Sequence, residues 1–363
     1  TLCVKDYGAV GDGITDDTAA IQAAIADEWA RISANPSAYA QSRNPIYFPA
    51  GNYLINAPIK LYPYITLIGD GADRTIIRLQ AGFVGAVLRT ADSLGQTGAN
   101  IGTNGAVLPT SITVNGFTLD SSFNSLNSII ILERSTDINI QNCKLFGAWS
   151  PGNFSTTGVV IRTLGTAITS ENINMDNVTF ENVAYGLYSE DPVQFINVTN
   201  SLFSTCYIGA ALIEGADTGP RYVRISNSTF RAIDSYGLYV TSNRRGISST
   251  NNSYFDVGNA YNQHSIYWDV GTLNCSSIGD VFNEPDASLR IFNGAPQTNA
   301  VFNAQSTELV ENTPTPRSKP ILFGQTNTST GIIFSLLNAT DMLTAWVDYS
   351  VVLGSYRKNG RLS

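Results

Sequence analysis

The chain is poor in the side chains that metal and nucleic-acid binding require. Its 363 residues include one histidine and four cysteines, and no two cysteines follow a Cys-x-x-Cys spacing, which argues against a zinc site. Its 29 acidic residues outnumber 21 basic ones, and the net charge of −8 disfavours binding to a phosphate backbone. No G-x-S-x-G elbow, P-loop or dinucleotide-binding fingerprint occurs. We therefore expect no metal, no cofactor and no nucleic-acid partner.

Long apolar runs are absent as well. No stretch of about 18 apolar residues could cross a bilayer, so we expect no membrane insertion. Charged residues make up only 14% of the chain, and the abundant glycine, asparagine, serine and threonine suit tight turns better than helices. Because the first residue is Thr1 rather than Met, we expect a trimmed or processed piece. The cysteines lie mostly within or beside apolar stretches, where we expect free, buried thiols: Cys3, Cys143, Cys206 and Cys275.

A short phrase returns along the middle of the chain. It consists of an alternating apolar run, an asparagine and another apolar residue soon after, as in ITVNGFTL (112–119) and INMDNVTF (173–180). Self-similarity at intervals of 23 to 35 residues indicates a solenoid. Asparagine suits a corner because it tolerates left-handed backbone, and its amide can hydrogen-bond to its copy one coil away. The six asparagines are Asn115, Asn142, Asn177, Asn200, Asn227 and Asn252.

A second phrase lies between the first ones and reads as a short strand. Examples are SIIILE (128–133), GAALIE (209–214) and SIYWD (265–269). Two or three short strands per repeat, without helical periodicity, describe a parallel β-helix, with coils ~4.8 Å apart. We therefore predict an all-β, single-stranded parallel β-helix over residues 46–310, with regular coils ending near residue 295.

The two ends differ from the repeats. Within the predicted cap domain, residues 1–45, four apolar residues spaced 4, 4 and 3 apart predict a capping helix over 17–33, which would cover the first coil. The prolines of 311–320 indicate a linker. Strand and turn signals after it predict a small C-terminal β domain within 311–363.

Three stretches near the start carry a family resemblance. VKDYGAVGDGITDDTAAIQAAI (4–25), IYFPAGNYLI (46–55) and ITLIGDGADRTIIRL (65–79) resemble the opening of the pectate-lyase-like right-handed parallel β-helix superfamily, and phage tailspikes and polysaccharide depolymerases most of all. The resemblance implies a right-handed β-helix that acts on polysaccharide. The Asn-Thr-Asp, Asp-Asp, Gly-His-Gly and Arg-Ile-Lys signature of polygalacturonase-like hydrolases does not appear. His264, without flanking glycines, is therefore expected to be an ordinary polar surface residue.

Acidic residues recur where the second phrase ends. Equivalent positions of a β-helix stack on one face, so carboxylates on neighbouring coils would lie ~5 Å apart, or ~10 Å apart with one coil between. These separations bracket those of retaining and inverting glycosidases. We predict Glu190, Asp191 and Glu214 as the catalytic group. The alignment of Gly186 with Gly209 would place Asp191, not Glu190, beside Glu214. The alternative is that these acids are solvated surface residues without a catalytic role.

Aromatic and basic residues accompany these acids. Sugar rings pack on aromatic faces, and arginine can bind acidic sugars with two parallel hydrogen bonds. Alternation sends about half of the aromatics into the core, so core packing is the alternative for each of them. Trp268, and the pair Arg244 and Arg245 in SNRRG, are expected at the surface. The predicted substrate-binding residues are Arg162, Tyr188, Tyr239, Arg244, Arg245, Trp268 and Asp269.

The sequence thus predicts a tailspike-like protein that binds and cleaves a bacterial surface polysaccharide by carboxylate-assisted glycoside hydrolysis. A polysaccharide lyase, with tyrosine as one available base, remains open. So does a virion protein that binds glycan during host attachment without cutting it. A secreted plant- or fungal-wall enzyme would need disulfides and glycosylated sequons. We expect a homotrimer, because exposed solenoid edges need cover, and a place in a virion tail or outside the cell.

Overall fold

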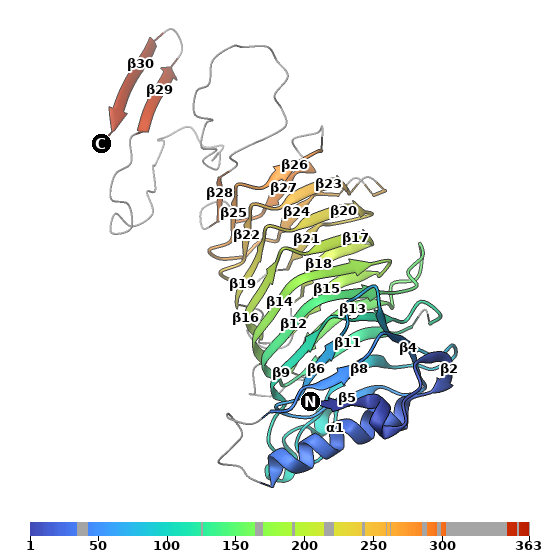
Figure 1. The fold of residues 1–363 in the computed structure, drawn as a ribbon. Helices are drawn as coiled ribbons and strands as arrows, with labels where there is room; N and C mark the ends of the chain where they lie inside the picture. Colours follow the sequence, from blue (N-terminus) through green and yellow to red (C-terminus); the bar gives the residue numbers. More distant parts are fainter. Residues whose placement is uncertain are drawn as a thin grey trace. The chain divides into compact units, whose positions relative to one another are not determined.

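The computed structural model describes residues 1–34, 43–124, 126–163, 170–190, 193–213, 221–241, 244–258, 260–261, 263–284, 289–295, 299–302, 347–353 and 356–362. The chain divides into two units, Thr1–Leu322 and Phe323–Ser363. The first is a parallel β-solenoid of about eight turns with one α-helix near the N-terminus (Figure 1). In the second, β29 (Val347–Leu353) pairs antiparallel with β30 (Tyr356–Leu362). The domain limits 1–45, 46–310 and 311–363 stay predictions, and the linker lies outside the described residues.

Face 1 is a sheet of nine parallel strands, one from each coil that contributes to it. Successive strands pair in register, so one residue position recurs as a straight column across the coils. The strands are β5 (Ile59–Leu61), β8 (Ala86–Thr90), β11 (Ser128–Glu133), β13 (Thr157–Arg162), β15 (Tyr185–Ser189), β18 (Ile208–Leu212), β21 (Leu238–Val240), β24 (Ile266–Trp268) and β27 (Ile291–Asn293).

Face 2 is the first of two parallel ladders that make up the other large sheet. Two of its strands, β12 and β14, are long enough to continue around the corner into the next ladder. The strands are β1 (Leu2–Cys3), β3 (Ile46–Phe48), β6 (Thr66–Gly69), β9 (Thr110–Asn115), β12 (Thr136–Phe146), β14 (Ser170–Glu181), β16 (Val193–Thr199), β19 (Arg221–Ser226), β22 (Ser248–Thr250), β25 (Ser276–Ile278) and β28 (Ala300–Phe302).

Face 3 is the second ladder of that sheet and includes the C-terminal halves of β12 and β14. Its other strands are β2 (Asp12–Asp16), β4 (Gly51–Ile55), β7 (Thr75–Leu79), β10 (Thr118–Asp120), β17 (Leu202–Cys206), β20 (Thr229–Ile233), β23 (Ser253–Val257) and β26 (Val281–Phe282). Short 3-10 helices occupy Val4–Tyr7, Gly98–Asn100 and Thr103–Gly105.

The predicted asparagine ladder forms the corner between faces 2 and 3. Asn142 and Asn177 have φ of 51° and 53°, and their amides donate to Asn115 and Asn142 at 2.9 and 2.8 Å. Two members were placed wrongly by a single residue. Beside Asn115, Gly116 takes the left-handed corner with φ 84°. Asn251, with φ 53°, takes the left-handed corner, whereas Asn252 is buried and donates to the Ile225 carbonyl at 2.8 Å.

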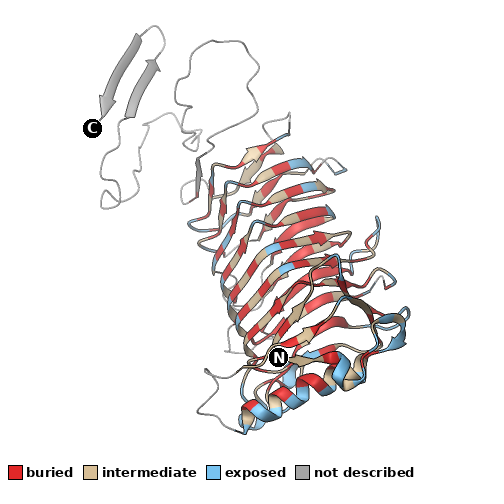
Figure 2. Ribbon diagram, in the orientation of Figure 1, coloured by how far each residue is buried: buried red, intermediate tan, exposed pale blue. Residues whose placement is uncertain are grey.

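A stack of rings fills the interior between faces 1 and 3. The centroids of Phe180, Phe203 and Phe230 lie 4.5 Å apart in turn, and Tyr254 and Phe282 continue the stack at 4.7 and 5.0 Å. Buried segments form bands across the coils in Figure 2. Opposite the rings, a Cβ at any of four face 1 glycines would approach a ring carbon to 2.7 Å or less. On four coils the second phrase therefore begins with glycine, because the rings leave no room for a side chain: Gly158, Gly186, Gly209 and Gly237.

The helix α1 (Thr18–Ser33) lies across the first coils, as predicted for 17–33 (Figure 1). Ile21, Ile25 and Ile32 are buried, and Trp29 stacks on Tyr62 at 6.1 Å. Three cysteines are buried and Cys3 is partly buried, all as free thiols, which confirms that expectation except for Cys3. Within the described residues, no helix has the length and apolarity needed to span a membrane.

Candidate functional site

One outward-facing column of face 1 changes character along the solenoid. Its members pair in register from β5 to β27. The early coils contribute basic and aliphatic side chains, and the later coils contribute mainly aromatic ones. The column is Lys60, Arg89, Ile131, Val160, Tyr188, Ala211, Tyr239, Tyr267 and Phe292.

The late coils carry two groups of aromatic rings in contact, which together we call the tyrosine face. At one end Tyr267 lies 5.3 Å from Tyr239 and 4.6 Å from Phe292. At the other end Tyr207 lies 4.5 Å from Phe154 and 6.2 Å from Tyr185. The face comprises Trp149, Phe154, Tyr185, Tyr188, Tyr207, Tyr236, Tyr239, Tyr261, His264, Tyr267 and Phe292.

The hydroxyls of Tyr185, Tyr188, Tyr236 and Tyr239 stay protonated at neutral pH. Burial raises the pKa of Tyr185, Tyr236 and Tyr239 above the ordinary value of 10.0. Burial also raises the pKa of Tyr188, followed by the negative charge of Glu190 beside it. A protonated phenol both donates and accepts hydrogen bonds. The face therefore offers apolar rings together with hydrogen-bonding hydroxyls.

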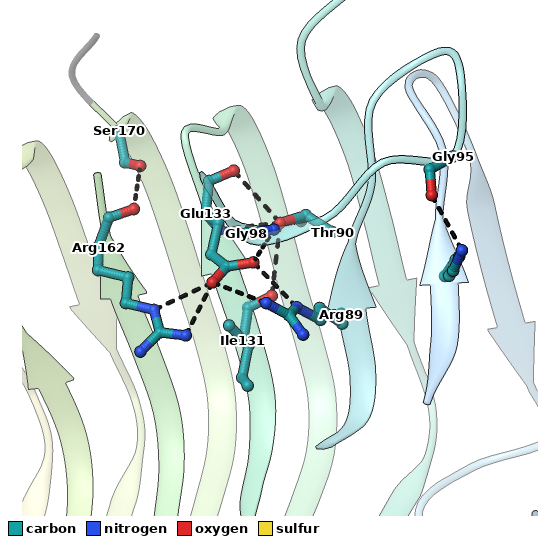
Figure 3. Close-up of polar contacts among 9 residues, drawn as sticks. Arg89, Thr90, Gly95, Gly98, Ile131, Glu133, Arg162 and Ser170 are labelled. Carbon is teal, nitrogen blue, oxygen red and sulfur yellow. Dashed lines mark hydrogen bonds and ion pairs between the residues drawn. The ribbon is translucent and has the colours of Figure 1, made fainter. Parts of the chain in front are cut away.

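The predicted acids lie where the strands of face 1 end. The first of them along the chain is Glu133, the last residue of β11, and its role is structural. Glu133 is fully buried. Figure 3 shows its carboxylate between Arg89 and Arg162, at 2.9 and 2.8 Å, with the Gly98 N–H donating to it at 2.9 Å. Burial would raise the pKa of Glu133, but the hydrogen bonds and charges of both arginines outweigh it and lower that pKa. A carboxylate held ionised in this way cannot act as a general acid.

Further along the column, two carboxylates stand beside tyrosines. Glu190 lies beside Tyr188, and Asp269 beside Tyr267, since burial and then the charge of each carboxylate raise the pKa of the tyrosine. The two pairs are three coils apart, because Tyr188, Ala211, Tyr239 and Tyr267 follow one another in register, which corresponds to ~14 Å at the usual strand spacing. The late coils therefore place carboxylates at the edge of the tyrosine face.

Of the predicted catalytic group, the structure describes only Glu190. Glu190 follows β15 and is partly buried. The pairing of Ser189 with Leu212 confirms the alignment of Gly186 with Gly209. Asp191 and Glu214 lie outside the described residues, so their part in the site stays a prediction.

The prediction that Trp268 and Arg244 lie at the surface is wrong. Trp268 is fully buried, because the strand alternation that turns Tyr267 outward turns Trp268 into the core. Arg244 is also fully buried. Arg245 is exposed, but its backbone forms a parallel β-bridge with Arg221 of face 2. It therefore lies away from the tyrosine face. Arg162 is committed to Glu133, whereas Tyr188, Tyr239 and Asp269 lie on or beside the tyrosine face.

Comparison with known proteins identifies the family. A family model described as rhamnogalacturonase A/epimerase, pectate lyase-like, matches residues 2–234, more than half of the chain. The chain belongs to this pectate-lyase-like family.

The solved structures and curated relatives agree with the fold. Protein ORF18 of Geobacillus virus E2 superimposes with a TM-score of 0.53 at 12% identity, covering 84% of this chain and 59% of the viral one. The likeness to that protein concerns the fold alone. The non-secreted LysM effector LysM19 of Penicillium expansum is 46% identical over 89 residues, or 24% of this chain and 7% of its own. A glucan 1,3-beta-glucosidase of Cochliobolus carbonum is 40% identical over 80 residues, or 21% and 10%. The chain thus spans a tenth or less of these curated relatives.

Sequence reasoning missed several features of this pectate-lyase-like protein. Trp149 and Phe154 join the tyrosine face from a segment between strands, and no repeat marks them. His264 was expected only as a surface residue, yet its ring lies 5.5 Å from Phe292 within the face. Asp234 follows β20, and burial, followed by the charge of Asp256, raises its pKa. Its position just before the SYGLYV phrase was the one available signal.

Proposed function

We propose that this pectate-lyase-like protein binds an extended polysaccharide along the tyrosine face and cleaves it by carboxylate-assisted glycoside hydrolysis. One observation carries the proposal. Aromatic rings on the late coils form two groups in mutual contact, and a carboxylate lies beside a tyrosine in each group.

The surface suits a sugar chain for physical reasons. The C–H faces of pyranose rings pack on aromatic rings, and tyrosine adds a hydroxyl at the ring edge. The hydroxyls of Tyr188, Tyr239 and Tyr267 recur along a straight column, which matches a polymer better than a compact ligand. Ala211 in the same column, between Tyr188 and Tyr239, is fully buried and separates the two groups of rings.

The catalytic group proposed for this reaction is Glu190, Asp191 and Glu214. One carboxylic acid would protonate the glycosidic oxygen, and another carboxylate would act as nucleophile or activate water. Glu190 stands beside the hydroxyl of Tyr188 at the edge of the face. The raised pKa values of the tyrosines support hydrolysis over elimination, because a lyase base must be able to lose its proton.

The natural substrate is proposed to be a bacterial surface polysaccharide, met by a virion tail or an extracellular protein. The family description and the relative named as a glucan 1,3-beta-glucosidase support action on polysaccharide. Glycan binding without cleavage is the second candidate, and the burial and pairing of Glu133 favour it by removing one acid of the column from catalysis.

The test is a panel of β-1,3-glucan, polygalacturonate and bacterial capsular polysaccharides. Hydrolysis predicts new reducing ends without absorbance at 232 nm, whereas elimination produces both. Binding without new reducing ends would identify a binding protein. If the protein neither binds nor cleaves any of these polymers, the proposal is wrong.

A homotrimer is proposed as the working form, because the last coil and the sheet edges need cover. Multi-angle light scattering should give about three times the 39.0 kDa chain mass. A stable monomer would contradict this prediction.

A further inference from the structure

Face 2 carries one left-handed residue on almost every coil, next to the segments that arrive from face 1. These residues pair in register across the coils. Most members are small or polar residues, and Asn, Asp and Gly tolerate positive φ. The series is Tyr64, Ser111, Asp137, Asn172, Phe195, Tyr222, Gly246 and Asn274, with φ between 54° and 69°.

Phe195 and Tyr222 are neighbouring bulky members of that series and, unlike the partly buried Tyr64, they are exposed. Positive φ is strained for bulky residues, yet both rings occupy it and stack on each other 5.3 Å apart at 9°. They are also 45% and 53% exposed, so burial does not offset the strain. Strained backbone that displays an exposed side chain is a feature of binding sites.

A groove of about 470 Å³ lies against Phe195. Its volume falls in the range of small-molecule sites. Its polar groups are held in place by neighbours: Asn197 donates to Asn174 at 3.0 Å, and Asn172 donates to Asp137. The groove is lined by Thr136, Asp137, Glu171, Asn172, Phe195 and Asn197.

We propose that this groove is a second carbohydrate site, which binds a neutral or N-acylated hexopyranose unit. The ring of Phe195 supplies a platform for the C–H face of the sugar, and Tyr222 stacks on Phe195 and supports it. Asn172 and Asn197, with the carboxylates of Asp137 and Glu171, supply donors and acceptors for its hydroxyls. The two carboxylates disfavour uronic acids because like charges repel.

This site is separate from the tyrosine face, because face 2 and face 1 are different sheets. It is not proposed to cleave anything. Two sites on one molecule would hold the same polymer at two points, and the second contact then forms at high effective concentration. The proposal stands whether or not the tyrosine face is catalytic.

The test uses variants chosen to leave the fold intact. Asparagine accepts left-handed backbone, so Phe195→Asn with Tyr222→Asn should keep the melting temperature unchanged or raise it. Phe255→Ala, which removes an exposed aromatic side chain of face 3, is the matched control. Tyr239→Ala with Tyr267→Ala weakens the tyrosine face, so that the binding which the two asparagine changes then remove reports on face 2.

The probes are cellohexaose, laminarihexaose and chitohexaose, with hexagalacturonate as the acidic comparison, measured by isothermal titration calorimetry. In the Tyr239→Ala/Tyr267→Ala protein, we expect one neutral probe to bind and the two asparagine changes to weaken it roughly tenfold or more. Phe255→Ala should leave binding unchanged.

Three results would overturn the inference. One is the absence of neutral-probe binding once the tyrosine face is weakened, which leaves the proposed function intact. Another is unchanged binding in the asparagine variant. The third is a change of oligomeric mass in that variant, which would identify Phe195 and Tyr222 as a contact between copies of the chain.

Discussion

Face 1 consists of two halves that are stabilised in different ways. In the early coils, a buried carboxylate on the column of strand ends joins Arg89 and Arg162 across three strands. In the late coils, the same column carries Glu190 and Asp269 beside tyrosines, and the support comes from the ring stack underneath. The same position therefore stabilises the fold where it is buried and paired, and it is available for chemistry where it borders an aromatic surface.

The largest expected effect is on the early half. Glu133→Ala removes the shared partner of two arginines and leaves their charges unpaired, so the free energy of unfolding should fall by about 3–5 kcal/mol. Chemical denaturation measures this. The control is Glu181→Ala, which breaks the exposed pair with Lys144 and should cost no more than about 1 kcal/mol. Equal losses in the two variants would abolish the distinction between the halves.

The late half should respond in activity instead of stability. If the protein is a hydrolase, Glu214→Gln or Glu190→Gln should lower the cleavage rate by at least ~100-fold, the contribution expected of a general acid or base. Unfolding should change little. Near-full activity in both variants would move the catalytic group elsewhere, and Asp234, whose pKa burial raises, is the next candidate.

The ring stack that supports the late half can be tested from inside. A Cβ in Gly209→Ala would lie 2.5 Å from the Phe230 ring and 2.6 Å from the Gly237 carbonyl oxygen. Such overpacking should destabilise the protein by roughly 1–3 kcal/mol. Phe230→Leu makes room, so the double variant should lose less than the two single losses added together. Additive losses would show that the ring and the glycine are not coupled.

The smallest effect concerns pH. The pKa of Glu133 is lowered in the folded state, so its stabilisation is present above the unfolded value near 4.5 and is lost as pH falls toward the folded pKa. The gap in unfolding free energy between the wild type and Glu133→Ala should be constant from pH 7 to about 5 and narrow below that. Urea unfolding between pH 7 and 3 measures it. A gap that persists to pH 3 would mean that the arginines do not act through charge.

The sequence carried enough information for the architecture because the β-helix repeats its rules. Alternation, corner asparagines and leading glycines each recur on several coils, so the sequence shows the same local pattern many times. The helix at 17–33, the coils and the alignment of Gly186 with Gly209 followed from these local patterns. The catalytic group did not follow with the same security, since acids at equivalent positions look alike in sequence.

Only the tertiary structure decided which of these equivalent side chains is buried, paired or exposed. Trp268 and Arg244 were predicted at the surface, but both side chains are fully buried. Glu133 became structural because arginines from two other coils reach it. The Phe195–Tyr222 stack joins residues 27 apart in sequence on neighbouring coils. Burial and charge pairing depend on distances between coils, and those distances arise only when the chain closes each turn onto the one before it.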